Sequence, residues 1–249
     1  MTDKLDILAA VRHALTSESR IGPQASHIEL AFAAGTLTLD GEVANVAAKK
    51  LALEGTAAVP GVAGIVDRLR VAPAQPMGDG QIRDLVRDAL LQEPALGEVA
   101  IREVVKGEEL SAREPAERRR GWIRLSVADG VVTLDGEVPG LAHKRLAGVL
   151  AWWVPGSRDV INGLGVEPAE EDNDDEIADA VRLVLEKDPF VDASQIRIGA
   201  RNAAVTLTGL VPTDSEREMA EFDAWYVFAV DRVINKLEVH PFPPTGQAR

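Results

Sequence analysis

A six-residue string that recurs three times constrains the fold of this 249-residue chain more than any other feature. The letters TLDGEV at residues 38–43 return at 133–138 and, as TLTGLV, at 206–211. The apolar positions around the shared glycines, Gly41, Gly136 and Gly209, keep one register in all three copies. Repetition of this kind predicts one supersecondary unit that is present three times.

Each copy changes its hydrophobic period in the same order. It begins with apolar residues four apart, as in Ile7, Val11 and Leu15, which predicts a helix with one buried stripe. Alternating apolar residues then predict two strands and, between them, a tight turn that needs positive φ. The residues expected in that turn are Gly35, Asp129-Gly130 and Asn202. A second helix is expected over about 46–58, 141–154 and 216–228, and a third strand over 65–71, 160–166 and 233–239.

This order of elements predicts an α+β fold of three tandem αββαβ modules. In each module, a small mixed three-stranded sheet should be covered on one face by two helices. We place the modules at residues 1–73, 78–168 and 173–240, with a tail at 241–249. The second module carries an insertion at about 102–121, which we interpret as a solvated loop or a short helix. Because units of this size bury little surface alone, the modules should pack on one another.

The composition excludes several classes of function. The absence of cysteine removes disulfides, thiolate metal sites and cysteine nucleophiles, and the net charge of −13 argues against nucleic acid as a partner. No histidine pair or acidic loop has the spacing of a metal site, so we predict no metal, no cofactor and no enzymatic activity. The N-terminal residues contain no signal-peptide core, and the longest apolar run, LAGVLAWWV, is too short to span a membrane. We therefore expect an acidic, soluble protein that is cytoplasmic as written.

The repeated strings resemble a known family. Residues 130–138 read GVVTLDGEV and residues 160–166 read VINGLGV, while the third copy has AVTLTG at 204–209 and VINKL at 233–237. The first copy is similar but has Asp67 where Asn162 and Asn235 stand. This pattern resembles the BON family, named for bacterial osmotic-stress and nodulation proteins. The resemblance implies a non-enzymatic, transport-associated bacterial module that contacts phospholipid or other envelope components, serves in osmotic or envelope stress and is often periplasmic.

Basic residues on the second helix are the candidate contacts for anionic lipid. Lys49-Lys50 and Lys144-Arg145 occupy equivalent positions in the first two modules, and Arg118, Arg119 and Arg120 end the insertion. Each basic residue close to an anionic bilayer contributes roughly 1 kcal/mol, so the four helix residues predict weak binding only. A solvated helix face is the alternative interpretation.

Two aromatic pairs are the candidates for an interface. Trp152-Trp153 and Trp225-Tyr226 occupy equivalent positions in the second and third modules. Neighbours on a helix point about 100° apart, so one ring of each pair should enter the core of its own module. The other ring should form a contact between modules two and three or an anchor at a membrane interface.

We therefore interpret the chain as a BON-type binding protein, with anionic phospholipid as the ligand that the resemblance implies. The alternative is a protein-interaction scaffold or a self-associating module that uses open sheet edges. A second alternative is a sensor of a small ion or small molecule, because modules can close on a ligand between them.

Overall fold

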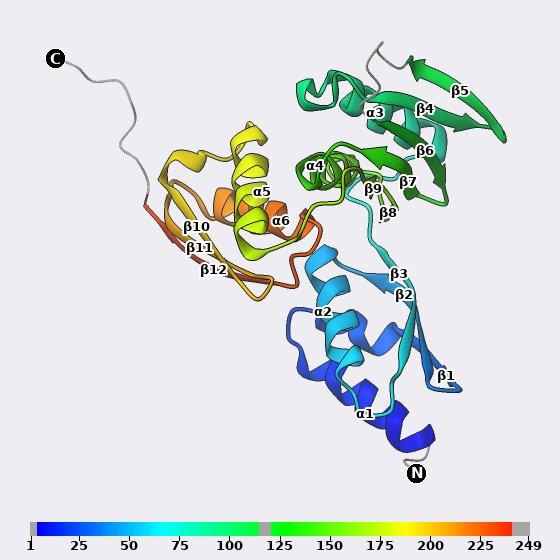
Figure 1. Ribbon diagram of the computed structural model, residues 1–249. Coiled ribbons are helices and arrows are strands. Elements are labelled where there is room, and N and C mark those ends of the chain that lie inside the picture. Colours follow the sequence, from blue (N-terminus) through cyan, green and yellow to red (C-terminus); the bar gives the residue numbers. More distant parts are fainter. Residues whose placement is uncertain (1–3, 115–120, 241–249) are drawn as a thin grey trace.

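The computed structural model describes residues 4–114 and 121–240, and the chain forms three modules that are each built on their own sheet (Figure 1). The strand orders are β1-β2-β3 in the first sheet and β10-β11-β12 in the third. The second sheet has the order β5-β4-β6-β7-β8, with β9 beside β7. The α+β class and the three tandem modules that the repeat predicts are thus confirmed.

The first and third modules contain the predicted elements in the predicted order. Module 1 consists of α1 (Lys4–Ser17), the 3-10 helix η1 (Gly22–His27), β1 (Glu29–Ala33), β2 (Thr36–Val43), α2 (Val46–Ala57) and β3 (Gly64–Val71). Module 3 consists of α5 (Asp174–Lys187), η3 (Ala193–Gln195), β10 (Ile196–Arg201), β11 (Ala204–Val211), α6 (Asp214–Tyr226) and β12 (Arg232–Val239). In both modules the first two strands pair antiparallel and the third pairs parallel to the second, so each sheet is mixed.

Periodic apolar residues explain these elements. The α1 helix buries Ile7, Val11 and Leu15, four residues apart, and β2 buries Leu37 and Leu39 on the face that its alternation predicts. Because both helices pack on the same face of the sheet, each module is a two-layer unit with one open sheet face.

The second module departs from the expected three strands because its insertion is part of the sheet. It consists of α3 (Asp79–Gln92), η2 (Pro94–Leu96), β4 (Ala100–Val105), β5 (Glu108–Arg113), β6 (Trp122–Ala128), β7 (Val131–Val138), α4 (Leu141–Trp152), β8 (Asp159–Asn162) and β9 (Gly165–Val166). The hairpin β4–β5 turns at Lys106 and Gly107, both at positive φ, and β4 pairs parallel to β6. The interpretation of the insertion as a solvated loop or short helix is therefore wrong for residues 102–113. Arg118, Arg119 and Arg120 lie outside the described residues.

The repeated glycines lie where the chain approaches itself closely. Gly41, Gly136 and Gly209 have φ values of +147°, +128° and +131°. A Cβ atom on Gly136 would lie 2.1 Å from the carbonyl oxygen of Trp122, and one on Gly209 would lie 1.9 Å from that of Gln195. A side chain is excluded at these two positions, which explains why the string keeps glycine there.

The hairpin turns in modules two and three are held by the helix that precedes them. The carboxylate of Asp79 at the start of α3 accepts hydrogen bonds from the backbone amides of Asp129 and Gly130 at 3.0 and 2.8 Å. In module 3, Asp174 accepts from Asn202 and Ala203 at 2.7 and 3.0 Å, and these bonds lower the pKa of Asp174. Asn202 has the expected positive φ, and so does Ala203, which takes the place of the glycine in the other turns.

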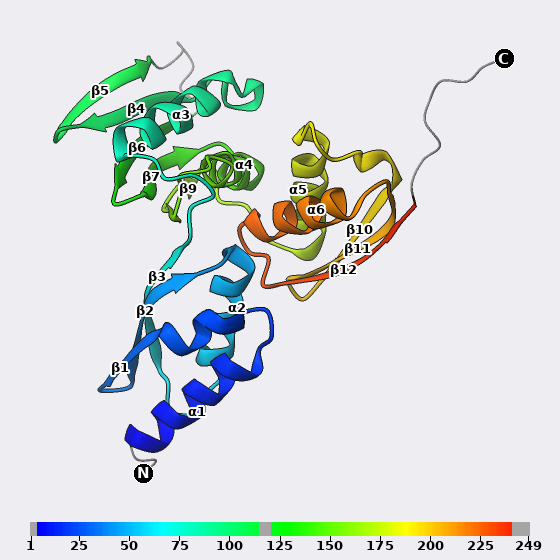
Figure 2. The ribbon, with the colours of Figure 1, turned by 180° about the vertical axis from the view of Figure 1, so that it is seen from behind.

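The modules pack around one junction (Figure 2). The buried apolar side chains of modules 1 and 3 form one continuous cluster that also includes Val149 of α4, and module 2 has a second cluster of its own. The second helix of module 3, α6, contacts the second helices α2 and α4 of the other two modules. The equivalent helices of the three repeats thus meet at the centre of the molecule.

Candidate ligand-binding site between the modules

Aromatic residues join α4 to α6 at the junction. The rings of Trp152 and Tyr226 are stacked, with centroids 5.9 Å apart and an interplanar angle of 14°. The indole Nε1 of Trp153 donates a hydrogen bond to Oδ1 of Asp223 at 2.9 Å. Trp225 is fully buried in module 3, and its ring lies 6.0 Å from the guanidinium of Arg20 in module 1. The structure therefore brings Trp152, Trp153 and Tyr226 together between modules two and three, while Trp225 belongs to a core.

Lys49 links module 1 to module 2 from a buried position. Its Nζ lies 2.9 Å from Oδ2 of Asp67 and 2.7 Å from Oδ1 of Asp159, and it donates a hydrogen bond to the carbonyl of Leu69 at 2.8 Å. Asp159 also pairs with Arg70 at 2.9 Å. A lysine that is only 6% exposed and paired in this way cannot reach a lipid surface.

Lys50 links module 1 to module 3. Its Nζ donates to the carbonyl oxygens of Val227 and Val230 at 3.0 and 2.8 Å, just beyond the C-terminal end of α6. Burial lowers the pKa of Lys50 to about 8, and the nearby charge of Asp231 opposes this shift. The ammonium group therefore binds carbonyls of the segment that follows α6, of which Val227 also accepts the backbone amide of Val230 at 3.3 Å.

Arg145 links module 2 to module 3. Its side chain is 1% exposed, and its guanidinium pairs with Asp172 and donates to the carbonyls of Glu176 and Phe228. Lys144 is half-buried, with its Nζ 4.7 Å from the centroid of the Phe228 ring. Of the four candidate lipid contacts on the helices, Lys49, Lys50 and Arg145 thus hold modules together. The sequence places these residues on the second helices of modules 1 and 2, but most of the partners that cover them come from other modules.

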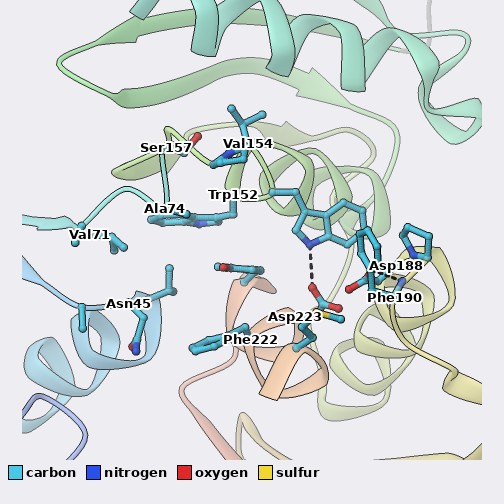
Figure 3. Close-up of a pocket in the computed structure, with 18 residues that line it drawn as sticks. Asn45, Val71, Ala74, Trp152, Val154, Ser157, Asp188, Phe190, Phe222 and Asp223 are labelled. Atoms are coloured by element: carbon cyan, nitrogen blue, oxygen red, sulfur yellow. Dashed lines mark hydrogen bonds between the residues drawn. The ribbon is translucent and has the colours of Figure 1, made fainter. Parts of the chain in front are cut away.

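Two cavities lie at the same junction. The first, of about 650 Å³, is lined by residues of all three modules, among them Asn45, Trp153, Phe190 and Asp223 (Figure 3). The second, of about 760 Å³, is lined by residues that include the Lys49–Asp67–Asp159 network. Val46, Trp152 and Tyr226 line both, so the stacked rings border each cavity. This junction is the candidate binding site.

Asp223 gives the first cavity its unusual electrostatics. Burial raises the pKa of Asp223 to about 8, the hydrogen bond from Trp153 opposes the shift, and the negative charge of Asp188 adds to it. Oδ2 of Asp223 has no hydrogen-bond donor among the described residues. A carboxyl group of this kind is protonated at neutral pH unless a cation replaces its proton.

The sequence interpretation missed Asp188, Phe190, Phe222 and Asp223. One signal for Asp223 was present, because α6 buries Glu216, Ala220 and Asp223 on the helical stripe where apolar residues are expected. Within residues 4–114 and 121–240, no group of three or more His, Asp or Glu side chains is placed to hold a metal ion. None of the helices described there is long and apolar enough to cross a membrane.

Comparisons with known proteins agree with the repeat. The model of the BON domain matches residues 3–73, 115–168 and 173–241. The chain belongs to the BON domain family, a family of non-enzymatic binding domains. No curated protein matches the chain.

Two solved structures of CdsD, a structural protein of the type III secretion system of Chlamydia trachomatis, are similar at 14% identity. The C-terminal domain of CdsD covers 96% of this chain and all of its own length, at a TM-score of 0.24. The second structure covers 94% of this chain and 91% of its own length, at 0.22. These TM-scores are too low to indicate a shared arrangement, so the family assignment depends on the matched repeats.

Proposed function

We propose that this BON-family chain is a binding protein without catalytic activity, whose three modules together hold a small amphipathic ligand at their junction. The observation that carries the proposal is the pair of cavities of about 650 and 760 Å³ around the Trp152–Tyr226 stack. Small-molecule sites in proteins have volumes of about 300–1,000 Å³, mostly apolar walls and a few polar groups. Because all three modules contribute walls to the first cavity, the proposal also gives a reason for three copies in one chain.

A neutral dye tests whether the junction takes up a ligand. N-phenyl-1-naphthylamine fluoresces in apolar surroundings, and we expect the wild-type chain to bind it. Ala74 lines the first cavity and Ala57 the second, and both side chains are exposed. Tryptophan at both positions would fill the cavities from their mouths, so Ala57→Trp/Ala74→Trp should bind the dye at least tenfold more weakly.

The control for this test is Ala31→Trp, an exposed residue of β1 that lines neither cavity. It should bind the dye as the wild type does. Failure of the wild type to bind, or equal binding by the doubly filled variant, would refute the junction as a ligand site.

Phospholipid binding in an envelope or osmotic-stress role, which the family resemblance implies, is the second candidate. Phe190 and Phe228 favour it, because they are 73% and 45% exposed and Lys144 lies beside the Phe228 ring. Aromatic rings next to basic groups are typical of membrane-interface anchors. Flotation with vesicles of phosphatidylglycerol and phosphatidylcholine should then be reduced in Lys144→Glu/Phe228→Ser. The matched control is Lys236→Glu on exposed β12, and equal flotation of all three proteins would contradict this candidate.

A further inference from the structure

We infer that the first cavity binds an organic cation, whose ammonium group lies among the aromatic rings and faces the carboxyl groups of Asp188 and Asp223. The inference depends on the proposed function, because it names the class of ligand for the same junction. It is supported by three observations: the rings, the charges and the buried carboxyl group of Asp223.

Aromatic rings form much of the wall of this cavity. The five rings are those of Trp152, Trp153, Phe190, Phe222 and Tyr226. Figure 3 shows Asp223 pointing from α6 towards the end of α4, with Asp188 and Phe190 beside it. A cation within about 6 Å of a ring face is attracted by the negative face of its π system, and the attraction grows when the site excludes water.

The charges that line the cavity all have one sign. Its charged side chains, Asp188 and Asp223, are both acidic, and no lysine or arginine is among its lining residues. The second cavity differs, since Lys49 and Lys50 are among its lining residues and Lys49 pairs with Asp67 and Asp159. A positively charged ligand is therefore favoured in the first cavity, whereas an anion would meet two carboxyl groups and no basic partner.

The carboxyl group of Asp223 is buried beside that of Asp188. The residue is 3% exposed, its Oδ1 accepts the bond from Trp153, and a hydrogen bond shared with the carboxyl group of Asp188 favours its protonated form. A buried negative charge without a counter-charge is costly, so the cationic group of a ligand beside Asp188 and Asp223 would stabilise their ionised form. A bare metal ion would need more oxygen ligands than these two carboxyl groups offer, which favours an ammonium carried on an apolar body.

The cation should compete with a proton. The titratable groups that line the cavity are Asp188 at the end of α5 and Asp223 and Tyr226 of α6, and α4 contributes the indole of Trp153. The pKa of Asp223 is raised to about 8, and burial raises that of Tyr226 to about 12, so the phenol stays neutral. Binding of a cation should therefore release a proton, and affinity should rise between pH 6 and pH 8.

Isothermal titration with three matched ligands tests the inference. Benzyltrimethylammonium, benzyl alcohol and phenylacetate share a benzyl group and differ in charge. We expect the full chain at pH 8 to bind the cation at least tenfold more tightly than the alcohol and to show no binding of the anion. Affinity for the cation should fall at least tenfold at pH 6, whereas affinity for the alcohol should not change.

Paired variants separate the carboxyl groups from general charge. Asp188→Asn/Asp223→Asn keeps both side-chain shapes and should lose the preference for the cation while it still binds benzyl alcohol. Glu186→Gln/Glu218→Gln removes two exposed charges from the same helices, α5 and α6, and should bind like the wild type. The wild-type preference itself needs no variant, so the test stands even if a variant does not fold.

Each result decides a different question. Equal binding of the cation and the alcohol would overturn the organic-cation site and leave the junction as a ligand site. Binding of the dye without binding of benzyltrimethylammonium would likewise overturn the organic-cation site and leave the junction as a ligand site. Absence of binding by the dye and by all three benzyl ligands would refute the proposed function together with this inference.

Discussion

Replacement of Asp223 by asparagine should change how the stability of the empty protein depends on pH. The folded-state pKa of Asp223 is about 8, well above the ordinary aspartate value of 3.8. Between these values the native state holds a proton that the unfolded state has lost, so the free energy of unfolding falls as the pH rises. One proton corresponds to about 1.36 kcal/mol per pH unit, which gives a loss of about 2–3 kcal/mol between pH 5.5 and pH 7.5. Asparagine carries no titrating proton, so Asp223→Asn should lack this loss.

Urea unfolding followed by tryptophan fluorescence measures this difference, because Trp152 and Trp153 lie at the junction. Both proteins are unfolded at pH 5.5 and at pH 7.5, and the two changes in free energy are compared. The amide oxygen of the introduced asparagine can still accept the bond from Trp153, so the variant should fold. Glu218→Gln, an exposed change on the same helix, is the control and should keep the wild-type slope. Equal slopes for wild type and Asp223→Asn would refute the claim that burial keeps this carboxyl protonated.

Three further changes test the junction and the repeat. Lys49→Met takes one of its two basic partners from the buried Asp159 and should lower the free energy of unfolding by about 1–3 kcal/mol in a urea titration, whereas Arg68→Met, in an exposed pair, should cost less than about 0.5 kcal/mol. Gly209→Ala should lower the melting temperature more than Gly41→Ala in a calorimetric scan, because the added Cβ atoms would lie 1.9 and 3.4 Å from the nearest carbonyl oxygens. The pKa of Lys50 is lowered to about 8, so between pH 8 and pH 10 the unfolded state binds a proton that the native state lacks. The free energy of unfolding of the wild type should therefore include a term that rises over this range. Lys50→Met should lack that term when both proteins are unfolded in urea at pH 8 and at pH 10.

Much of the fold could be predicted because each module contains its own periodic signal. The stripe Ile7, Val11 and Leu15 and the alternation around Leu37 are local patterns, and equivalent patterns occur in all three copies of the repeat. The hairpin β4–β5 was not predicted from the sequence, because an inward-facing position of β4 carries a charge. Glu103 is 8% exposed and lies 3.0 Å from Nε of Arg83 on α3. A buried acid that is paired by a helix from the same module cannot be distinguished from a solvated one by hydropathy alone.

The candidate site could be predicted only in part. The aromatic pairs stood out because aromatic residues are scarce, at 4% of the chain. The burial of Lys49 depends on Asp159, which is more than one hundred positions away and belongs to another module. Arg145 likewise meets residues of the linker before α5 and of module 3. No local pattern specifies such contacts, because they follow from how complete modules pack on one another.

Differences between equivalent residues indicate where the modules meet. In modules 2 and 3 the amides of Asn162 and Asn235 donate to the backbone carbonyls of Lys144 and Arg217, at 2.8 and 2.9 Å, and so join the third strand to the second helix of the same module. Module 1 has Asp67 at this position, and a carboxylate cannot donate to a carbonyl. Asp67 instead faces the ammonium of Lys49, which also reaches Asp159 of module 2. The exchange of amide for carboxylate thus accompanies a contact between modules, and Asp67 lines the second cavity of the junction at which the ligand is proposed to bind.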